Sequence, residues 1–346
     1  MKKRTIAMLL ALCMILSLAL LGCEKQGTTN GGNNAASSSG DAAIMKDDTA
    51  EYHMFVHYAG YSFWQECWRG FQDAANVMGV KASYSGTPEY ELNAVLTAFN
   101  QLVAQKPSGI AVTAMDSAAY VDPINNAIAE GVDIVVFDSD CPDSNRLAFI
   151  GTENYNCGVA AADFIAEDLG GKGKVGMITS LTQSNIVQRN EGFAATMDAK
   201  YPDIEYEIIA SSTEESATVD AVKSLLQVNP DIVYLFPTTF GALTGTLTAV
   251  DEMGLTDQIK IITFDTDEAT LDYIENGRVQ ASVSQSPYCM GWWSLMYLYF
   301  LDHDDMVSAS EDWKANGYPF LPPTADSGST IVTKDNAFMF RRGSEG

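Results

Sequence analysis

Short apolar runs alternate with segments of helical spacing along most of this chain, and this alternation restricts the fold more than any other feature. The first half has apolar runs at 53–58, 80–84, 108–113 and 132–137, separated by helical segments at 63–78, 89–105 and 121–129. After a break near 151–154 come helical segments at 155–169, 185–200, 214–228 and 239–253, with apolar runs at 174–179, 204–210, 231–236 and 260–264. Repeated strand-helix units of this kind form parallel sheets that helices cover on both faces. The sequence therefore predicts an α/β protein with two lobes.

The length of the chain indicates two domains, and its charge disfavours one class of ligand. Its 346 residues are 47% apolar, which is enough for two cores of similar size. Acidic residues number 45 against 20 basic ones, and the formal net charge is -25. A surface this acidic repels phosphate backbones, so we do not expect the protein to bind nucleic acid.

The first residues are typical of an export signal. Lys2–Arg4 form a basic N-terminal segment. The apolar run at 6–21 is shorter than a typical membrane-spanning helix and lies at the N-terminus, as in a signal peptide. The run ends in Leu20–Cys23, with the sequence LLGC, which resembles the lipobox of bacterial lipoproteins. In that motif the signal is removed before the cysteine, and the cysteine carries the lipid.

This resemblance divides the N-terminal region into two parts. We expect a signal peptide at 1–22 and a flexible tether at 23–50, which is rich in Gly, Asn, Ser and Thr. Cys23 would be the lipid anchor, and the protein would touch the membrane only through it. The alternative is an ordinary secretory signal followed by a chance cysteine.

An acidic residue follows a buried strand at the same place in both halves. Residues 134–140 read IVVFDSD and residues 261–267 read IITFDTD, so Asp138 and Asp265 occupy equivalent positions. Ligands of parallel sheets bind at the carboxyl ends of the strands, so two facing sheets would present both aspartates to a shared cleft. The alternative is that each aspartate caps a helix or sets a turn.

Other motifs do not predict chemistry. The GKGKVG segment at 171–176 has the glycine spacing of a dinucleotide site but precedes a strand, so we interpret it as a turn. The chain has six scattered cysteines without a C-x-x-C pair and three histidines, so we expect no metal and no cofactor. We expect buried thiols at four positions, and an oxidising compartment would permit one or two disulfides among them: Cys67, Cys141, Cys157 and Cys289.

From residue 51 to about 335 the order of segments resembles the periplasmic sugar-binding proteins of the ribose-binding type. The similar segments include YSFW at 61–64, the stretch ending in DIVVFDSD at 104–140, RNEGF at 189–193, the stretch beginning IITFDTD at 261–291, and TADSGSTIVTKDN at 324–336. The resemblance implies a type I periplasmic-binding-protein fold, in which two Rossmann-like lobes are joined by a hinge that the chain crosses three times. It places the N-terminal lobe at 51–153 plus 286–325 and the C-terminal lobe at 154–285 plus 326–346.

In the N-terminal lobe the resemblance implies four ligand-binding residues. His57 stands where relatives place a polar contact, and Asp138 matches the aspartate of this lobe. Phe63 and Trp64 match two aromatic rings whose flat faces suit the C–H face of a sugar, although core packing is the alternative. Ser62 and Gln65 have the spacing of a capping box, which would fix both rings at the start of a helix.

In the C-terminal lobe the resemblance implies four more. Asp265 and Gln285 match the aspartate and the hinge glutamine of the family. Arg189 matches a recurrent helix arginine, which makes either a ligand contact or a structural ion pair. Thr239 lies where relatives usually have Asn-Asp, so we expect that part of the pocket to be rebuilt. Ser139 also stands where aldopentose binders often have an arginine, which disfavours ribose as the ligand.

Together these observations predict a lipid-anchored, monomeric solute-binding protein on the extracytoplasmic side of the cell membrane. It would capture a small neutral sugar or polyol in a cleft between the lobes and deliver it to an ABC permease. The alternative function is a sensory module that presents the ligand to a membrane receptor or a histidine kinase. We do not predict an enzyme, because the carboxylates of Asp138 and Asp265 alone do not make a glycosidase. The export signal occupies the place of a DNA-binding headpiece, which disfavours a repressor.

Overall fold

Two six-stranded sheets form the framework of the protein in a computed structural model. The model describes residues 49–89, 91–181, 183–211, 215–239, 241–303, 316, 319 and 321–341. The predicted signal peptide, the predicted anchor Cys23 and the predicted tether up to residue 48 lie outside the described residues. Within the described ranges, no helix is both long and apolar enough to cross a membrane.

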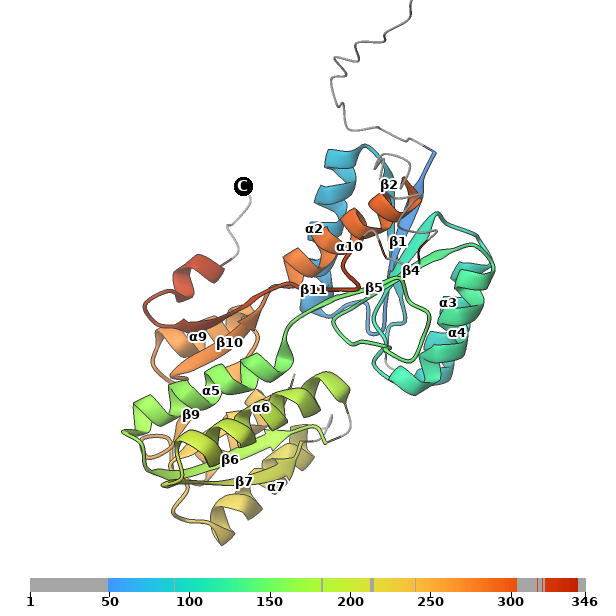
Figure 1. Ribbon diagram of the computed structural model, residues 1–346. Coiled ribbons are helices and arrows are strands. Elements are labelled where there is room, and N and C mark those ends of the chain that lie inside the picture. The colour runs from blue at the N-terminus through green and yellow to red at the C-terminus, as the bar shows by residue number, and fades with distance from the viewer. Residues whose placement is uncertain are drawn as a thin grey trace, which may run out of the picture. The chain divides into compact units, whose positions relative to one another are not determined.

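The first sheet has the strand order β11-β5-β4-β3-β1-β2, and its neighbouring strands are parallel. Its strands are β1 (Glu51–Val56), β2 (Lys81–Gly86), β3 (Gly109–Val112), β4 (Asp133–Phe137), β5 (Ala148–Gly151) and β11 (Thr324–Asp326). Its helices are α2 (Ser62–Met78), α3 (Leu92–Val103), α4 (Ser117–Ala129) and α10 (Pro287–Asp302). Met54 packs on the side of α2 and α10, and the next residue, Phe55, packs on the side of α3 and α4 (Figure 1). Helices therefore cover both faces of this sheet.

The second sheet has the order β12-β10-β9-β8-β6-β7, and only β12 is antiparallel to its neighbour. Its strands are β6 (Gly173–Thr179), β7 (Ile204–Ala210), β8 (Tyr234–Pro237), β9 (Lys260–Phe264), β10 (Ala281–Gln285) and β12 (Ser329–Thr333). Its helices are α5 (Asn154–Leu169), α6 (Ser184–Lys200), α7 (Glu215–Val228), α8 (Ala242–Glu252), α9 (Glu268–Glu275) and the 3-10 turn η2 (Ala337–Phe340). Residues of α5 and α6 share one core cluster, and residues of α7, α8 and α9 share another.

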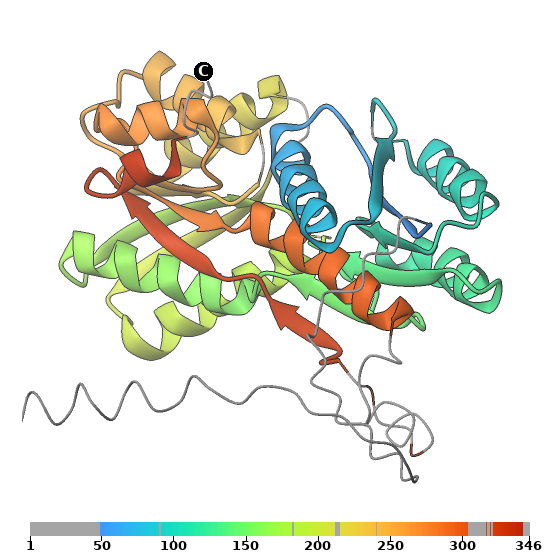
Figure 2. The same cartoon turned by 90° about the horizontal axis from the view of Figure 1, so that it is seen from above.

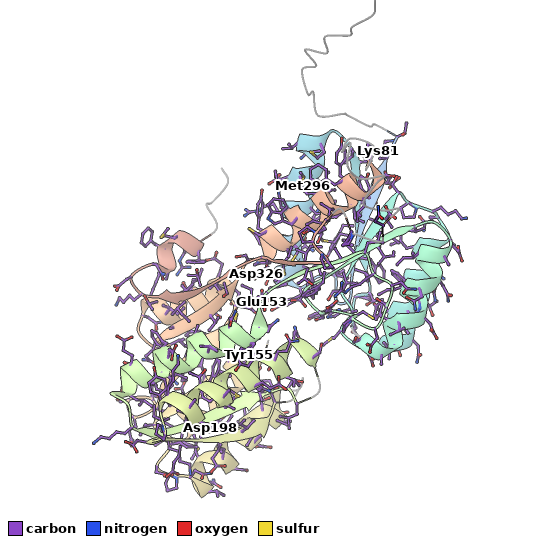
Figure 3. All side chains as sticks on the ribbon, in the orientation of Figure 1. Lys81, Glu153, Tyr155, Asp198, Met296 and Asp326 are labelled. Carbon is purple, nitrogen blue, oxygen red and sulfur yellow. The ribbon has the colours of Figure 1, made fainter. Side chains whose placement is uncertain are left out.

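The chain passes between the two sheets at three places. These lie between β5 and α5, between β10 and α10, and between β11 and β12. Two of them are in contact, because the Glu153 backbone N–H donates to Asp326 Oδ1 over 3.3 Å, and Figure 3 shows these residues close together. The predicted α/β fold with two lobes and three crossings is confirmed.

Several local predictions can be compared with the elements. Gly171 and Gly173 have φ angles of 83° and 146° and precede β6, so the glycine-rich segment is a turn, as predicted. The first apolar run forms a strand only to Val56, because Tyr58 has a left-handed backbone with φ of 52°. All four cysteines in the described residues are free thiols. Three of them are buried, whereas the prediction of burial is wrong for Cys289, which is partly exposed because it lies beside a cavity at the start of α10.

Candidate functional site

Asp138 and Asp265 occupy the same structural position in the two lobes. Each directly follows a buried strand, β4 or β9, and their φ angles of 61° and 67° are left-handed. Each backbone N–H donates over 3.0 Å to the next strand, at the carbonyl oxygen of Ile150 or of Val283. Non-glycine residues rarely adopt this conformation, and it concentrates at functional sites.

Neither aspartate caps the helix that follows it. The cap of α9 is Asp267, whose Oδ1 accepts from the backbone N–H groups of Ala269 and Thr270 over 3.0 and 3.1 Å. The Asp138 carboxylate accepts instead from Ser139 Oγ, 2.8 Å away, and Asp265 Oδ1 accepts from Gln285 Nε2, 2.9 Å away. The helix-capping alternative is therefore wrong for both side chains.

Burial dominates the electrostatics of this pair. Asp138 is 8% exposed, and burial raises its pKa to about 6, against the opposing effects of the Ser139 hydrogen bond and the Arg189 charge. Burial also raises the pKa of Asp265, and the Arg189 charge and the Gln285 hydrogen bond oppose that rise. A buried carboxylate is stable only when donors surround it, so both groups favour a ligand rich in hydrogen-bond donors.

The positive charge that acts on both carboxylates is the guanidinium of Arg189. Uncharged groups hold this side chain in place. Its Nε and Nη2 atoms donate to Asn154 Oδ1 over 3.0 and 2.8 Å, and its Nη1 donates to the Thr238 carbonyl over 2.9 Å. Its Cζ atom lies 3.7 Å from the centre of the Phe264 ring. Burial lowers the pKa of Arg189, and the charge of Asp265 opposes the shift. The side chain is thus fixed in orientation beside the end of β9.

A cluster of rings stands at the start of α2. Phe63 and Trp64 meet edge to face, with centroids 5.0 Å apart, and Tyr61 stacks on Phe63 at 6.0 Å. The two predicted rings are 9% and 4% exposed and belong to the first-lobe core, and they also line a cavity, so core packing is present and ligand contact stays a prediction. The His57 ring lies 5.2 Å from Trp64, and burial lowers its pKa to about 4, so it is neutral at pH 7.

The predicted capping box does not form. Helix α2 begins at Ser62, with Tyr61 in the capping position and without a side-chain cap from it. The Gln65 amide donates to the Ala59 carbonyl over 2.8 Å instead of returning to the helix start. The loop before α2 supplies this carbonyl because it turns sharply at Tyr58, which sequence spacing could not reveal.

One cavity of about 810 Å³ collects the predicted residues, and we call it the main cavity. All eight predicted ligand-binding side chains line it: His57, Phe63, Trp64, Asp138, Arg189, Thr239, Asp265 and Gln285. They come from both lobes. The first four lie after β1, in α2 and after β4 of the first lobe, and the last four belong to the second lobe. Thr239 Oγ1 lies 3.1 Å from Ser211 Oγ, which lines the same cavity.

The sequence reasoning missed several other lining residues. In the first lobe they are Tyr58, Tyr61, Glu89, Met115 and Ser139, and in the second lobe they include Ser180, Gln183, Asn185, Ser211 and Thr238. Three of them directly follow a strand, namely Ser180 after β6, Ser211 after β7 and Thr238 after β8. Four more lie two or three residues beyond a strand end: Tyr58, Glu89, Met115 and Ser139. The rule that ligands bind at the carboxyl ends of parallel strands could have identified them. In the part of the chain that the structure describes, no three His, Cys, Asp or Glu residues are grouped to hold a metal ion.

Comparisons with known proteins agree with this architecture. Residues 52–302 match the family described as "Periplasmic binding protein domain". The chain is 25% identical over 256 residues to the D-allose-binding periplasmic protein of Escherichia coli, covering 70% of this chain and 81% of that protein.

Two solved structures are also similar. A sugar ABC transporter (sugar-binding protein) from Bacillus halodurans is 35% identical with a TM-score of 0.77, covering 84% of this chain and 100% of that one. The arabinose-binding protein AraP of Geobacillus stearothermophilus is 35% identical with a TM-score of 0.76, covering 85% and 99%.

Proposed function

The chain belongs to the periplasmic binding protein domain family, and we propose that it binds a small neutral sugar or polyol in the main cavity. We propose further that it delivers this ligand to an ABC importer. Proteins of this family bind solutes without transforming them, so the chain is a binding protein and not an enzyme. Similar proteins are named for D-allose and arabinose, which supports a sugar as the ligand.

The observation that carries the proposal is the pair of buried carboxylates on one cavity. Asp138 and Asp265 come from different lobes, and both line the main cavity. An ionised carboxylate offers about four acceptor sites, whereas the side-chain donors to these two are Ser139 and Gln285. Sugar hydroxyls are donors of the required kind, and the rings of the aromatic cluster offer apolar faces to C–H groups.

The charge around the cavity argues against an anionic ligand. Glu89, Asp138 and Asp265 line it, against the single guanidinium of Arg189 among the described lining residues. That guanidinium already donates to Asn154 and to the Thr238 carbonyl. A sugar phosphate or an amino-acid carboxylate would therefore meet repulsion and find no free bidentate partner.

The division of the site between two lobes supplies a mechanism of capture. A ligand that contacts both Asp138 and Asp265 would stabilise a closed arrangement of the lobes, and only such differential contact can shift the equilibrium between open and closed forms. The three crossings are the segments in which a hinge motion would be absorbed. Release to a permease would then require the lobes to open.

Calorimetric titration of the mature chain tests the proposal. The panel is aldopentoses, aldohexoses, inositols, sugar phosphates and amino acids. We expect micromolar binding or tighter, about -8 kcal/mol, for at least one neutral sugar or polyol, and none for the phosphates. Tight binding confined to a phosphorylated sugar or an amino acid would overturn the assignment.

We also propose that Cys23 carries a lipid that holds the protein at the outer side of the cell membrane. The proposal is supported by the LLGC sequence at the end of the apolar run and by the polar stretch that follows it. A lipid on Cys23 would keep the binding lobes next to a permease without inserting them into the bilayer.

A further inference from the structure

A second cavity of about 340 Å³ adjoins the main cavity, and we call it the hinge-side cavity because the crossing segment 284–289 lines it. The two cavities share four lining residues: Tyr61, Phe63, Asp265 and Gln285. The two cavities therefore adjoin at these four residues.

The four shared residues form two pairs of side chains that contact each other. One is the hydrogen bond from Gln285 Nε2 to Asp265 Oδ1, and the other is the stack of Tyr61 on Phe63, with 16° between the ring planes. Both pairs therefore line both cavities, and they include a carboxylate, an amide and two rings. A ligand seated on Asp265 in the main cavity is therefore next to the hinge-side cavity.

The first-lobe wall of the hinge-side cavity is a fixed aromatic surface. Tyr288 donates its hydroxyl to Asp73 Oδ2 over 3.0 Å and stacks on Trp292 with centroids 6.3 Å apart. The Arg69 guanidinium lies 5.3 Å from the Tyr288 ring and is bound to Glu66 over 2.5 Å. The Tyr288 side chain is therefore held in place beside the cavity, so little conformational entropy is lost when a ligand contacts it.

The second-lobe wall consists of apolar side chains and an arginine whose charge is paired with carboxylates. Phe340 and Met339 line it, and Met339 is 71% exposed. Arg341 also lines this wall, and its guanidinium is bound by Glu268, Asp272 and Glu275 of α9. Because both arginines of this cavity are paired with carboxylates, the cavity offers hydrogen bonds without attracting an anion.

We propose that the ligand is larger than one sugar ring: a neutral disaccharide or glycoside, with one unit in the main cavity and the second in the hinge-side cavity. The inference rests on the proposed function and names the substrate class of that site. A cavity of 340 Å³ lies within the size range of small-molecule sites, so it can hold one further sugar residue. The cavity is lined by the Tyr288 ring, by the paired charges described above and by the hydroxyls of Thr266, Ser284 and Ser286. A second sugar residue can contact groups of these kinds.

Calorimetry with single sugars and with neutral disaccharides of 1,2, 1,3 and 1,4 linkage tests the inference. We expect at least one disaccharide to bind about tenfold more tightly than its constituent monosaccharide. Tyr288→Ala should remove this advantage and leave the affinity for the monosaccharide within about twofold, and Tyr288→Phe should retain it. The matched control is Trp293→Ala, which removes an aromatic ring of the same helix that lines neither cavity and is 45% exposed.

A second variant covers the case in which Tyr288→Ala fails to fold. Arg69 has a half-exposed side chain, and Arg69→Ala should reduce the disaccharide advantage in the same direction. The inference is overturned if every disaccharide binds more weakly than its monosaccharide, or if the advantage persists in both variants. In those cases the monosaccharide still binds, so the proposed function stands. Failure of all neutral sugars, single and linked, would instead overturn the proposed function.

Discussion

At the scale of single residues, the two cavity aspartates combine burial with a left-handed backbone, and both features oppose stability in the sugar-free protein. Asp138 illustrates the conflict, since burial raises its pKa from 3.8 to about 6. The folded protein therefore binds a proton between these pH values that the unfolded chain does not bind. The stabilising contribution of this protonation is complete below pH 3.8 and is lost as the pH rises through 6.

Asp138→Asn should consequently stabilise the sugar-free protein and weaken binding. Asparagine tolerates the left-handed conformation and does not ionise, so we expect a gain on the order of 2 kcal/mol at pH 7.5 that disappears near pH 4. Affinity for the sugar should fall about ten- to hundredfold, because a charged acceptor is lost. Thermal unfolding at the two pH values and calorimetry measure both effects. A less stable sugar-free variant at pH 7.5 would contradict the burial cost.

The same scale shows what a sequence can predict about a site. The equivalent positions of Asp138 and Asp265 were visible in the repeated strand-end pattern, and both side chains line the main cavity. The partners of Arg189 were not visible, because Asn154 and Thr238 reach it only through tertiary folding. The contact role of each lining residue stays a prediction until a ligand is bound.

At the scale of elements, glycines allow close packing of one helix pair in each lobe. An added Cβ on Gly291 of α10 would collide with the Cys67 carbonyl of α2, and one on Gly158 of α5 would collide with the Arg189 carbonyl of α6. Figure 2 shows α2 and α10 side by side along their length. The second pair bears directly on the site, since Asn154 of α5 holds Arg189 of α6.

Gly158→Ala should therefore separate α5 from α6 and displace Arg189. We expect a loss of stability of about 1 to 3 kcal/mol, as for other overpacked cores, together with weaker sugar binding. Gly60→Ala is the control, because nothing lies within 4 Å of a Cβ added there. Chemical denaturation of both variants gives the stability, and equal stability of the two would argue against close packing of α5 on α6.

Elements also differ in how far their sequences reveal them. The repeated β-α units were evident because several of their strands are almost continuously apolar, as in DIVVF of β4 and KIITF of β9. Strands β11 and β12 were not evident as strands, because they are short, are only partly buried and carry Thr, Ser and Asp. Their assignment to different sheets depends on pairing with β5 and β10, which are distant in the sequence.

At the scale of the whole molecule, the proposed function combines a binding cavity lined by both lobes with a lipid anchor at Cys23. The predicted anchor, Cys23, lies outside the described residues. Cys23→Ser should release the protein from the membrane fraction into the periplasm or the medium, because a lipid can no longer be attached there. Sugar binding should be unchanged. Fractionation followed by immunoblotting measures the release, and a variant that stays with the membrane would exclude Cys23 as the anchor.

Capture of a neutral sugar or polyol by the main cavity can be tested on the protein as its own cell makes it. The most direct measurement is mass spectrometry of the small molecules released by denaturing protein that has been purified from its native host. We expect a neutral polyhydroxylated compound, in amounts approaching one per protein molecule. A phosphorylated sugar or an amino acid released at that stoichiometry would contradict it.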